Sequence, residues 1–273
     1  MMGAGISRTT RIAHLTDIHF GATDAAVVAG LIADLAAWRP DLVVVSGDLT
    51  MGARRWEFRA ARAFMDSLGA PVLSVPGNHD ITPYRPIERF FMPFARWHQE
   101  IAAETEPVWQ DGRVGVVGLN TAHRMTPHLD WSRGRVTHRG LARLLGKLEA
   151  LPAGLTKIVV AHHPLLPPEG EFTKQIADGA KRALAALAAH GVRLVLSGHL
   201  HRAYARLTEP VILQGGSATS VRLRGEPNEY NLISVDDSGE VNVQGRQWNK
   251  GAWAEGRRRL LLPAGLGTQA VLF

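Results

Sequence analysis

The chain contains no cysteine among its 273 residues. This absence excludes disulfide bonds, thiolate metal sites and cysteine nucleophiles. The chain also lacks an apolar run approaching the roughly 20 residues that a membrane-spanning helix needs. Residues 1–10 hold no apolar stretch of the kind found in signal peptides, and we interpret them as an extension ahead of the first strand. Together these absences favour a cytoplasmic protein.

Acidic residues are outnumbered, with 31 Lys and Arg against 25 Asp and Glu, a formal net charge of +6 and a pI of about 10.1. The arginines are scattered, however, and the densest cluster is only Arg257–Arg259, with no aromatic residues interleaved. This distribution favours a solvated basic surface over a nucleic-acid-binding face. Such a surface attracts small anionic substrates, so we expect a small anionic substrate and no nucleic-acid partner.

Short apolar runs alternate with helical patterns over the first two-thirds of the chain, which is typical of βα units. From about Tyr204 onward the pattern is one of short strands only. The expected helices are residues 25–38, 54–68, 87–103, 139–151 and 173–190. The expected strands before residue 204 are residues 11–16, 42–46, 72–75, 107–110, 114–119, 157–161 and 192–197. The pattern predicts an α/β fold with two β-rich halves flanked by helices.

A hydrophobic content of 45% lets a chain of this length bury a full core. We expect one domain over residues 1–247, followed by a C-terminal tail over residues 248–273. The tail holds Trp248, Trp253, the arginine cluster and the run Leu260–Leu262. We expect it to form a strand and a tail packed on the domain. Weak contact of the tail with a membrane surface is the alternative.

Five short runs of metal-ligand residues occur in order along the chain, and each follows an expected strand. They are Asp17-Ile18-His19, Gly47-Asp48, Gly77-Asn78-His79-Asp80, His162-His163-Pro164 and Gly198-His199-Leu200-His201. An open α/β fold places its active site at the carboxyl ends of its strands. Each run alone is weak evidence, but all five in this order predict one active site.

The side chains of these runs suit hard or borderline cations, because Asp, His and Asn are present and Cys is absent. Asp48 follows a strand end, where its carboxylate can use both oxygens to bridge two metals. The candidate ligands are two carboxylates, one amide and four imidazoles: Asp17, Asp48, Asn78, His19, His162, His199 and His201. This number suits two metal ions about 3.5–4 Å apart with a bridging hydroxide that attacks phosphorus.

The ordered set of motifs resembles that of the calcineurin-like metallophosphoesterase superfamily, over residues 17–201. The resemblance implies a four-layer α-β-β-α sandwich with a two-metal centre at one edge. By motif position, the two sets of ligands share Asp48. The first set would be Asp17, His19, Asp48 and His201. The second set would be Asp48, Asn78, His162 and His199.

The resemblance also implies roles for residues that do not bind metal. His79 would contact the substrate phosphate and protonate the leaving oxygen. Asp80 would orient His79 or brace its loop. The family ligand aligns with His162, the first histidine after the strand, and His163 would orient its neighbours.

Within the superfamily, the chain is most similar to class III cyclic-nucleotide phosphodiesterases and glycerophosphodiesterases. The similarity rests on residues 15–21, 46–50, 162–164 and 215–220. It implies a metal-dependent phosphodiesterase acting on a small phosphodiester. A pyrophosphatase or phosphodiesterase acting on a lipid-linked nucleotide-sugar is the alternative. A non-catalytic binding module would have lost ligands, whereas all seven are present here. A nuclease would have a clustered basic groove, which the sequence does not show.

Several residues outside the motifs are further candidates for the pocket mouth. They are Asn120, His123, Arg124 and His128 in one loop, and Arg222 and Arg224 in another. The expected helix over residues 87–103 follows the Asn78 motif directly and would overhang the site as a cap. The choice among Mn, Fe and Zn and the oligomeric state remain open at this point.

Overall fold

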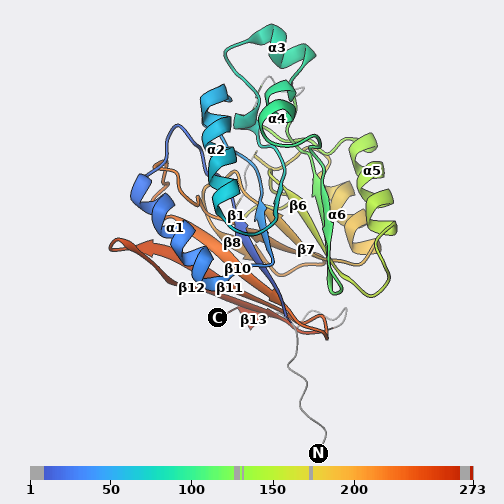
Figure 1. Ribbon diagram of the computed structural model, residues 1–273. Helices are drawn as coiled ribbons and strands as arrows, with labels where there is room; N and C mark the ends of the chain where they lie inside the picture. Colours follow the sequence, from blue (N-terminus) through green and yellow to red (C-terminus); the bar gives the residue numbers. More distant parts are fainter. Residues whose placement is uncertain (1–8, 126–129, 131, 172–174, 265–270, 273) are drawn as a thin grey trace, which may run out of the picture.

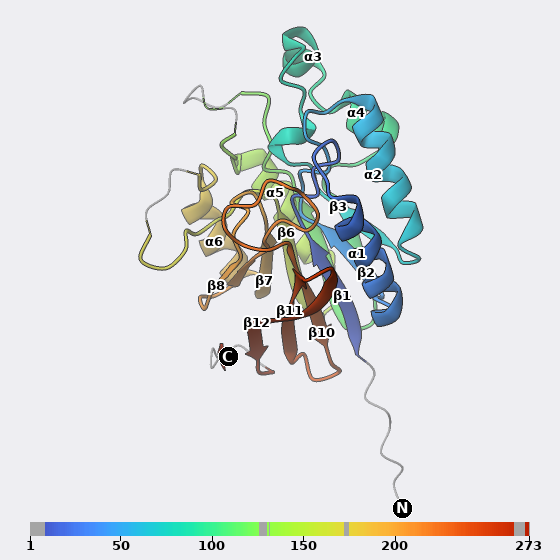
Figure 2. The same ribbon diagram turned by 90° about the vertical axis from the view of Figure 1, so that its left-hand side faces the viewer.

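Two mixed β-sheets lie face to face, and helices cover the outer face of each sheet (Figures 1 and 2). The computed structural model describes residues 9–125, 130, 132–171, 175–264 and 271–272. The first sheet has the strand order β13-β12-β11-β10-β1-β2-β3, and the second has the order β4-β5-β6-β7-β9-β8. Strands β1, β2 and β3 are mutually parallel, as are β5, β6, β7 and β9. The predicted four-layer α-β-β-α sandwich is confirmed.

Strands and helices are interspersed up to β7, and the described elements after it are strands alone. The strands are β1 (Thr10–Leu15), β2 (Leu42–Val45), β3 (Val72–Ser74), β4 (Val108–Gln110), β5 (Val114–Leu119), β6 (Thr156–Ala161), β7 (Val192–Ser197), β8 (Tyr204–Arg206), β9 (Val211–Gln214), β10 (Glu229–Val235), β11 (Val241–Asn249), β12 (Ala252–Leu262) and β13 (Val271–Leu272). The helices are α1 (Ala25–Trp38), α2 (Arg55–Ser67), the 3-10 helix η1 (Asn78–Asp80), α3 (Pro86–Phe91), α4 (Ala95–Glu100), α5 (His138–Glu149) and α6 (Ala180–Ala189).

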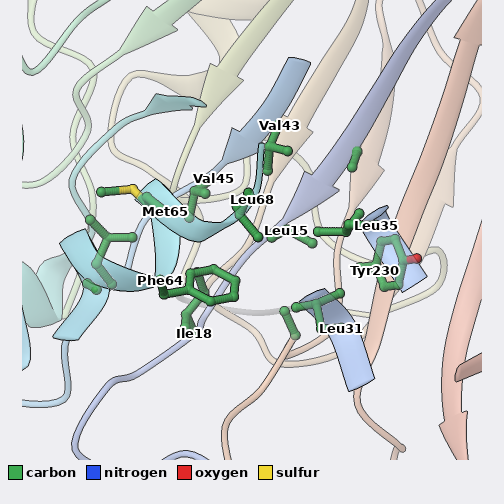
Figure 3. Packing of buried hydrophobic residues seen from close by; sticks show 14 of the residues in the cluster. Leu15, Ile18, Leu31, Leu35, Val43, Val45, Phe64, Met65, Leu68 and Tyr230 are labelled. Atoms are coloured by element: carbon green, nitrogen blue, oxygen red, sulfur yellow. The ribbon is translucent and has the colours of Figure 1, made fainter. Parts of the chain in front are cut away.

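Three hydrophobic cores separate the four layers, because successive side chains of a strand point to opposite faces. In β2, Val43 and Val45 pack toward α1 and α2. Figure 3 shows part of this core. Leu42 and Val44 pack between the two sheets. A third core lies between the second sheet and helices α5 and α6. Strands buried on both faces are therefore almost continuously apolar, which explains the apolar runs in the sequence.

The C-terminal segment forms part of the first sheet. Strand β11 runs through residues 247 and 248, where a boundary between domain and tail is expected, and it pairs with β12. Trp248 and Trp253 pack against α1, and Gly30 lies in α1 where a side chain would meet the Trp248 ring. Leu260 and Leu262 are buried between the two sheets. The leucine run is thus largely part of the core, and the domain boundary itself stays a prediction.

The prediction of one continuous helix over residues 87–103 is wrong. Two short helices, α3 and α4, occupy this segment. Pro93 lies between them. Proline has no N–H to donate and disfavours helical backbone at the residue before it, so the first helix ends near Met92. The helix expected from Thr173 begins only at Ala180, after Gly179 with a φ of 81°. Thr173 lies outside the described residues.

None of the helices that the structure describes has the length and the apolar content needed to cross a membrane.

Candidate metal centre

The five ligand runs lie in loops that follow β1, β2, β3, β6 and β7, at one edge of the sandwich. Five of the candidate ligands have left-handed backbone, with φ between 51° and 79°: Asp17, His19, Asp48, His199 and His201. Such backbone is uncommon outside glycine, and strain of this kind gathers at functional sites. The loops after β1, β2 and β7 therefore turn sharply and bring these side chains back over the strand ends.

One group of ligand atoms comes from Asp17, His19 and His201. The Nε2 atoms of His19 and His201 lie 3.2 Å apart, and their rings stack with centroids 4.9 Å apart. Asp17 Oδ1 is 3.4 Å from His201 Nε2 and 3.7 Å from His19 Nε2. All three residues are buried. Their free lone pairs face one small space, as the ligands of a single ion would.

A second group comes from Asp48, Asn78 and His162. His162 Nε2 lies 3.3 Å from Asp48 Oδ2 and 3.1 Å from Asn78 Oδ1. The ring of His199 is near, with its centroid 5.2 Å from that of His162. Asp48 Oδ2 is also 3.7 Å from His19 Nε2. The same carboxylate oxygen therefore faces an imidazole of each group.

Backbone carbonyls orient the imidazoles of His19 and His162. His19 Nδ1 lies 3.2 Å from the carbonyl oxygen of Thr50, and His162 Nδ1 lies 2.8 Å from that of Ser46. A carbonyl accepts a hydrogen bond, so each Nδ1 carries a proton and Nε2 is the nitrogen that can bind a metal ion. This arrangement is the usual support of a metal-binding histidine.

His163 differs from His162 because both of its ring nitrogens are engaged by the protein. Its Nε2 lies 2.9 Å from the Ser132 carbonyl oxygen, and its Nδ1 lies 2.9 Å from Thr121 Oγ1. Nε2–H donates to the carbonyl, which leaves Nδ1 to accept from the threonine hydroxyl. His163 has no lone pair left for a cation, so the hydrogen bonds favour His162 as the ligand.

Asp80 braces the loops rather than the ring of His79. Its buried carboxylate accepts hydrogen bonds from the N–H groups of Gly77, Leu49 and Thr50, and from the Thr50 hydroxyl. Desolvation, followed by the charge of Asp48, raises the pKa of Asp80 to about 6. Asp80 thereby holds the loop of Asp48 against the loop of Asn78.

His79 is half-buried, and a backbone carbonyl fixes its ring. Its Nδ1 lies 2.7 Å from the carbonyl oxygen of Met51, to which it donates. Its Nε2 lies 3.3 Å from Nη1 of Arg222, a cationic donor on the loop after β9. Its backbone N–H donates to Asp48 Oδ1 at 2.9 Å. The ring is thus aimed at the rim of the site, beside an arginine.

The loop of Arg222 is joined to the loop of Asp17 by hydrogen bonds. Ser217 Oγ donates to the carbonyl of Asp17, and Thr219 Oγ1 donates to that of Ile18, both at 2.9 Å. The backbone of Arg222 donates to Ser220 Oγ at 3.1 Å. These bonds hold the loop that carries Arg222 against the loop of Asp17.

Two glycines give the ligand loops the space to interlock. A Cβ on Gly77 would lie 2.1 Å from Asp48 Oδ1, and a Cβ on Gly198 would lie 1.8 Å from Thr16 Oγ1 and 2.6 Å from Asp17 Oδ2. Gly198 does not have a left-handed φ, so its backbone conformation does not require glycine. Both glycines are required by close approach.

The electrostatics of the site favour a bound cation. Burial by itself would raise the pKa of Asp48, but the charges of His162 and His79 outweigh burial and hold it well below its usual value. Burial lowers the pKa of His162, yet Asp48 raises it to about 9. Desolvation, reinforced by His162, lowers the pKa of His199 to about 3. Ionised carboxylates in a buried site therefore attract positive charge while His199 stays neutral.

Unpartnered atoms test whether metal ions fit the site. Asp17 Oδ1 and His199 Nε2 are buried and have no hydrogen-bond partner among the residues described. Buried polar atoms are nearly always partnered. Their oxygen and imidazole character suits Mn, Fe or Zn. The residues present thus fit a metal centre.

The candidates in the loop after β5 make structural contacts. His123 Nε2 lies 2.8 Å from the Arg135 carbonyl oxygen, and Arg124 Nη1 donates to the Phe90 carbonyl at 2.6 Å. Asn120 Oδ1 accepts from the Ala122 N–H at 2.9 Å. His128 lies outside the described residues. Arg224 is exposed.

Comparison with known proteins agrees with this geometry. The family model for calcineurin-like phosphoesterases matches residues 10–203. A probable cyclic nucleotide phosphodiesterase of Synechococcus sp. is 29% identical over 223 residues, which are 74% of this chain and 77% of that protein. A probable glycerophosphodiester phosphodiesterase of Arcobacter nitrofigilis is 24% identical over 184 residues, 67% of this chain and 64% of that protein.

The fold also recurs in a solved structure. A dimetal phosphatase from Danio rerio superimposes with a TM-score of 0.64 at 12% identity, covering 90% of this chain and 98% of that one. At this identity the likeness shows the fold alone. The match of the family model over more than half of the chain shows the family. The chain belongs to the calcineurin-like phosphoesterase family and is a metal-dependent hydrolase of phosphate esters.

Proposed function

We propose that the chain hydrolyses a small phosphodiester of the cyclic-nucleotide or glycerophosphodiester class in the cytoplasm. The observation that carries this proposal is the position of Asp48 between the two groups of ligand atoms, 3.7 Å from His19 Nε2 and 3.3 Å from His162 Nε2. The names of the two curated relatives support the substrate class. The proposed ligands are Asp17, His19, Asp48, Asn78, His162, His199 and His201.

Two metal ions bound by these residues would supply Lewis acidity and an activated water molecule. The chain's own residues would bind and orient the ester. Asp48 would hold the two groups of ligands together, and Asp80 would keep the loops of Asp48 and Asn78 in register through its four hydrogen bonds. Any Mn, Fe or Zn pair is consistent with this set of donors.

His79 and Arg222 would contact the phosphate group. In the structure Arg222 donates to His79 Nε2, so both groups point at the same place on the rim. A phosphate oxygen arriving there would accept from the guanidinium, a strong charge-assisted bond. With Arg222 on the phosphate, His79 Nε2 would be free to take up a proton, and the resulting imidazolium, held at Nδ1 by the Met51 carbonyl, would give that proton to the leaving oxygen.

The test is a substrate screen with protein stripped of metal and reconstituted with Mn²⁺, Fe²⁺ or Zn²⁺. The panel holds bis(p-nitrophenyl) phosphate, cyclic nucleotides and glycerophosphodiesters, and elemental analysis follows the metal content. We expect near-zero turnover after stripping and recovery on reconstitution. Undiminished turnover with no metal present would contradict the proposal, and activity only on monoesters would contradict the substrate class.

A second candidate is a nucleotide-diphosphate-linked acylated sugar as substrate. The observation that favours it is the exposed apolar surface of α3, where Ile87 and Phe91 are 75% and 79% exposed. This candidate predicts turnover that depends on detergent or lipid, whereas a small phosphodiester is hydrolysed without either. Comparing the rates on both kinds of substrate, with and without detergent, separates the two.

A further inference from the structure

Helix α3 buries its charged side and exposes its apolar side. Arg89 is 2% exposed, whereas Ile87 and Phe91 are 75% and 79% exposed. Residues two apart lie on nearly opposite sides of a helix, so Arg89 points inward while its neighbours point to solvent. Arginine is among the residues least often buried. A helix that buries its arginine and exposes its apolar side chains indicates that a partner covers the apolar side.

Arg89 fixes α3 to the body of the protein. Its Nε donates to the carbonyl of Arg124 at 2.9 Å, and its Nη1 donates to that of Ile81 at 3.1 Å. Ile81 directly follows η1, which carries Asn78 and His79. The exposed side of α3 is therefore held at a set position relative to the metal centre.

The apolar surface extends beyond α3. Trp56 at the start of α2, Tyr84 before α3 and Met92 after it are 54%, 66% and 58% exposed. These residues border a cleft of about 1070 Å³ between the start of α2 and the α3–α4 segment. We call Trp56, Tyr84, Ile87, Phe91 and Met92 the α3 surface. Contiguous apolar exposure of this kind marks interaction sites.

The described residues that line this cleft carry an excess of positive charge, although Arg54 and Arg55 lie 3.9 and 3.5 Å from Glu57 and Glu100. Arg54, Arg55 and Arg85 line the same cleft, and the guanidinium of Arg54 lies 5.5 Å from the centre of the Tyr84 ring. Among the described residues that line the cleft, the one acidic residue is Glu88, which is paired with Arg96 at 2.5 and 2.7 Å. The partner that complements this surface is therefore apolar and anionic at once, as an anionic lipid bilayer is.

The position of α3 also suits a flat partner. Both views show α3 projecting beyond the ends of the two sheets, away from the N-terminus (Figures 1 and 2). The C-terminal tail is a poorer candidate for lipid contact, because Leu260 and Leu262 are buried in the core. We propose that the α3 surface docks on an anionic phospholipid bilayer, with its apolar side chains among the headgroups and Arg54, Arg55 and Arg85 facing lipid phosphates.

The experiment is sedimentation of the metal-loaded full-length protein with vesicles of phosphatidylglycerol and phosphatidylcholine, or of phosphatidylcholine alone. We expect binding to the anionic vesicles only, weakened between about 0.1 M and about 1 M salt. The double variant Ile87→Ser, Phe91→Ser should bind about tenfold less tightly. Arg85→Glu should weaken binding in the same direction.

Leu207→Ser is the matched control. Leu207 is 44% exposed in the turn before β9, at the end of the sheet opposite the metal centre, and its loss should leave vesicle binding unchanged. Hydrolysis of bis(p-nitrophenyl) phosphate without vesicles should be the same in all variants. That rate tests the proposed function separately, because it requires no lipid.

Three results would overturn the proposal. One is no binding to anionic vesicles by the wild type. Another is equal binding by the wild type and the Ile87, Phe91 double variant. The third is a dimer, measured by light scattering, that dissociates in the double variant while vesicle binding is unchanged, because a second copy of the chain would then cover the α3 surface.

Discussion

Replacing Gly77 with alanine would put a methyl group into the contact between the loops of Asn78 and Asp48. The added Cβ would lie 2.1 Å from Asp48 Oδ1, 2.5 Å from the Asp48 backbone nitrogen and 2.8 Å from Asp48 Cγ. Real Cβ atoms essentially never lie under 3.0 Å from such neighbours. The side chain of Asp48 cannot simply rotate away, because the backbone nitrogen is also too close.

One loop must therefore shift by about an ångström, and a displacement of that size can cost about 10²-fold in rate. The shift also strains the bond from Gly77 N–H to Asp80 Oδ2, which is 2.9 Å long. Forcing extra atoms into a packed site costs typically about 1–3 kcal/mol of unfolding free energy. Because Asp48 faces both groups of ligands, we expect Gly77→Ala to lose metal from both sites.

Three measurements follow these effects in one set of samples: metals per chain by elemental analysis, the rate on bis(p-nitrophenyl) phosphate, and the free energy of unfolding in urea. Gly112→Ala is the matched control, since nothing lies within 4 Å of its added Cβ. The control should keep its metal and its rate. A Gly77→Ala protein with two metals per chain and the wild-type rate would refute the reasoning.

Four further predictions concern single side chains. His79→Ala should keep both metals and lose about 10²–10⁴-fold in rate on unactivated diesters, with a smaller loss for p-nitrophenyl esters; equal losses on both would leave His79 a binding role only. Arg222→Ala should raise KM for both kinds of ester at unchanged metal content, and an unchanged KM would remove Arg222 from the phosphate site. Asp48→Ala should lower the metal content at both sites and His201→Ala at one, as counted by elemental analysis; saturation of the wild type at one metal per chain would contradict two sites. Burial lowers the pKa of His14 from 6.5 to about 3, so between these pH values the unfolded chain binds a proton at His14 and the folded chain does not. The free energy of unfolding should therefore fall by about 1.4 kcal/mol per pH unit as the pH drops from 6.5 toward about 3. If urea titrations of His14→Gln give the same pH slope as the wild type, His14 is not the cause.

The order of the motifs was enough to predict the fold class and to predict that the candidate ligands form one site. Asp17, Asp48 and His162 each follow a buried strand closely, and parallel strands end at the same edge. Local residue chemistry and strand order are therefore sufficient to place these ligands together. The four-layer sandwich itself came from the resemblance, and the structure confirms it.

Apolar patterns in the sequence were ambiguous where the same pattern suits both a buried and an exposed segment. Phe91 has helical spacing with its apolar neighbours, which is typical of a buried helix face. It is nevertheless 79% exposed, because Pro93 interrupts the helix and Arg89 anchors the segment instead. Leu260 and Leu262 suit a membrane-facing tail as well as a buried strand. Pairing of β12 with β11 decided between these, and pairing depends on residues distant in sequence.

The sequence by itself determined which residue types stand at the strand ends, because strand periodicity and ligand chemistry are local properties of the chain. The tertiary structure alone decided how those side chains are used. His162 and His163 are adjacent and chemically identical. The Ser46 carbonyl engages Nδ1 of His162, whereas the Thr121 hydroxyl and the Ser132 carbonyl engage both ring nitrogens of His163. The Met51 carbonyl that holds His79 carries no signal in the sequence either, because every residue has a backbone carbonyl and only folding brings one to the right atom.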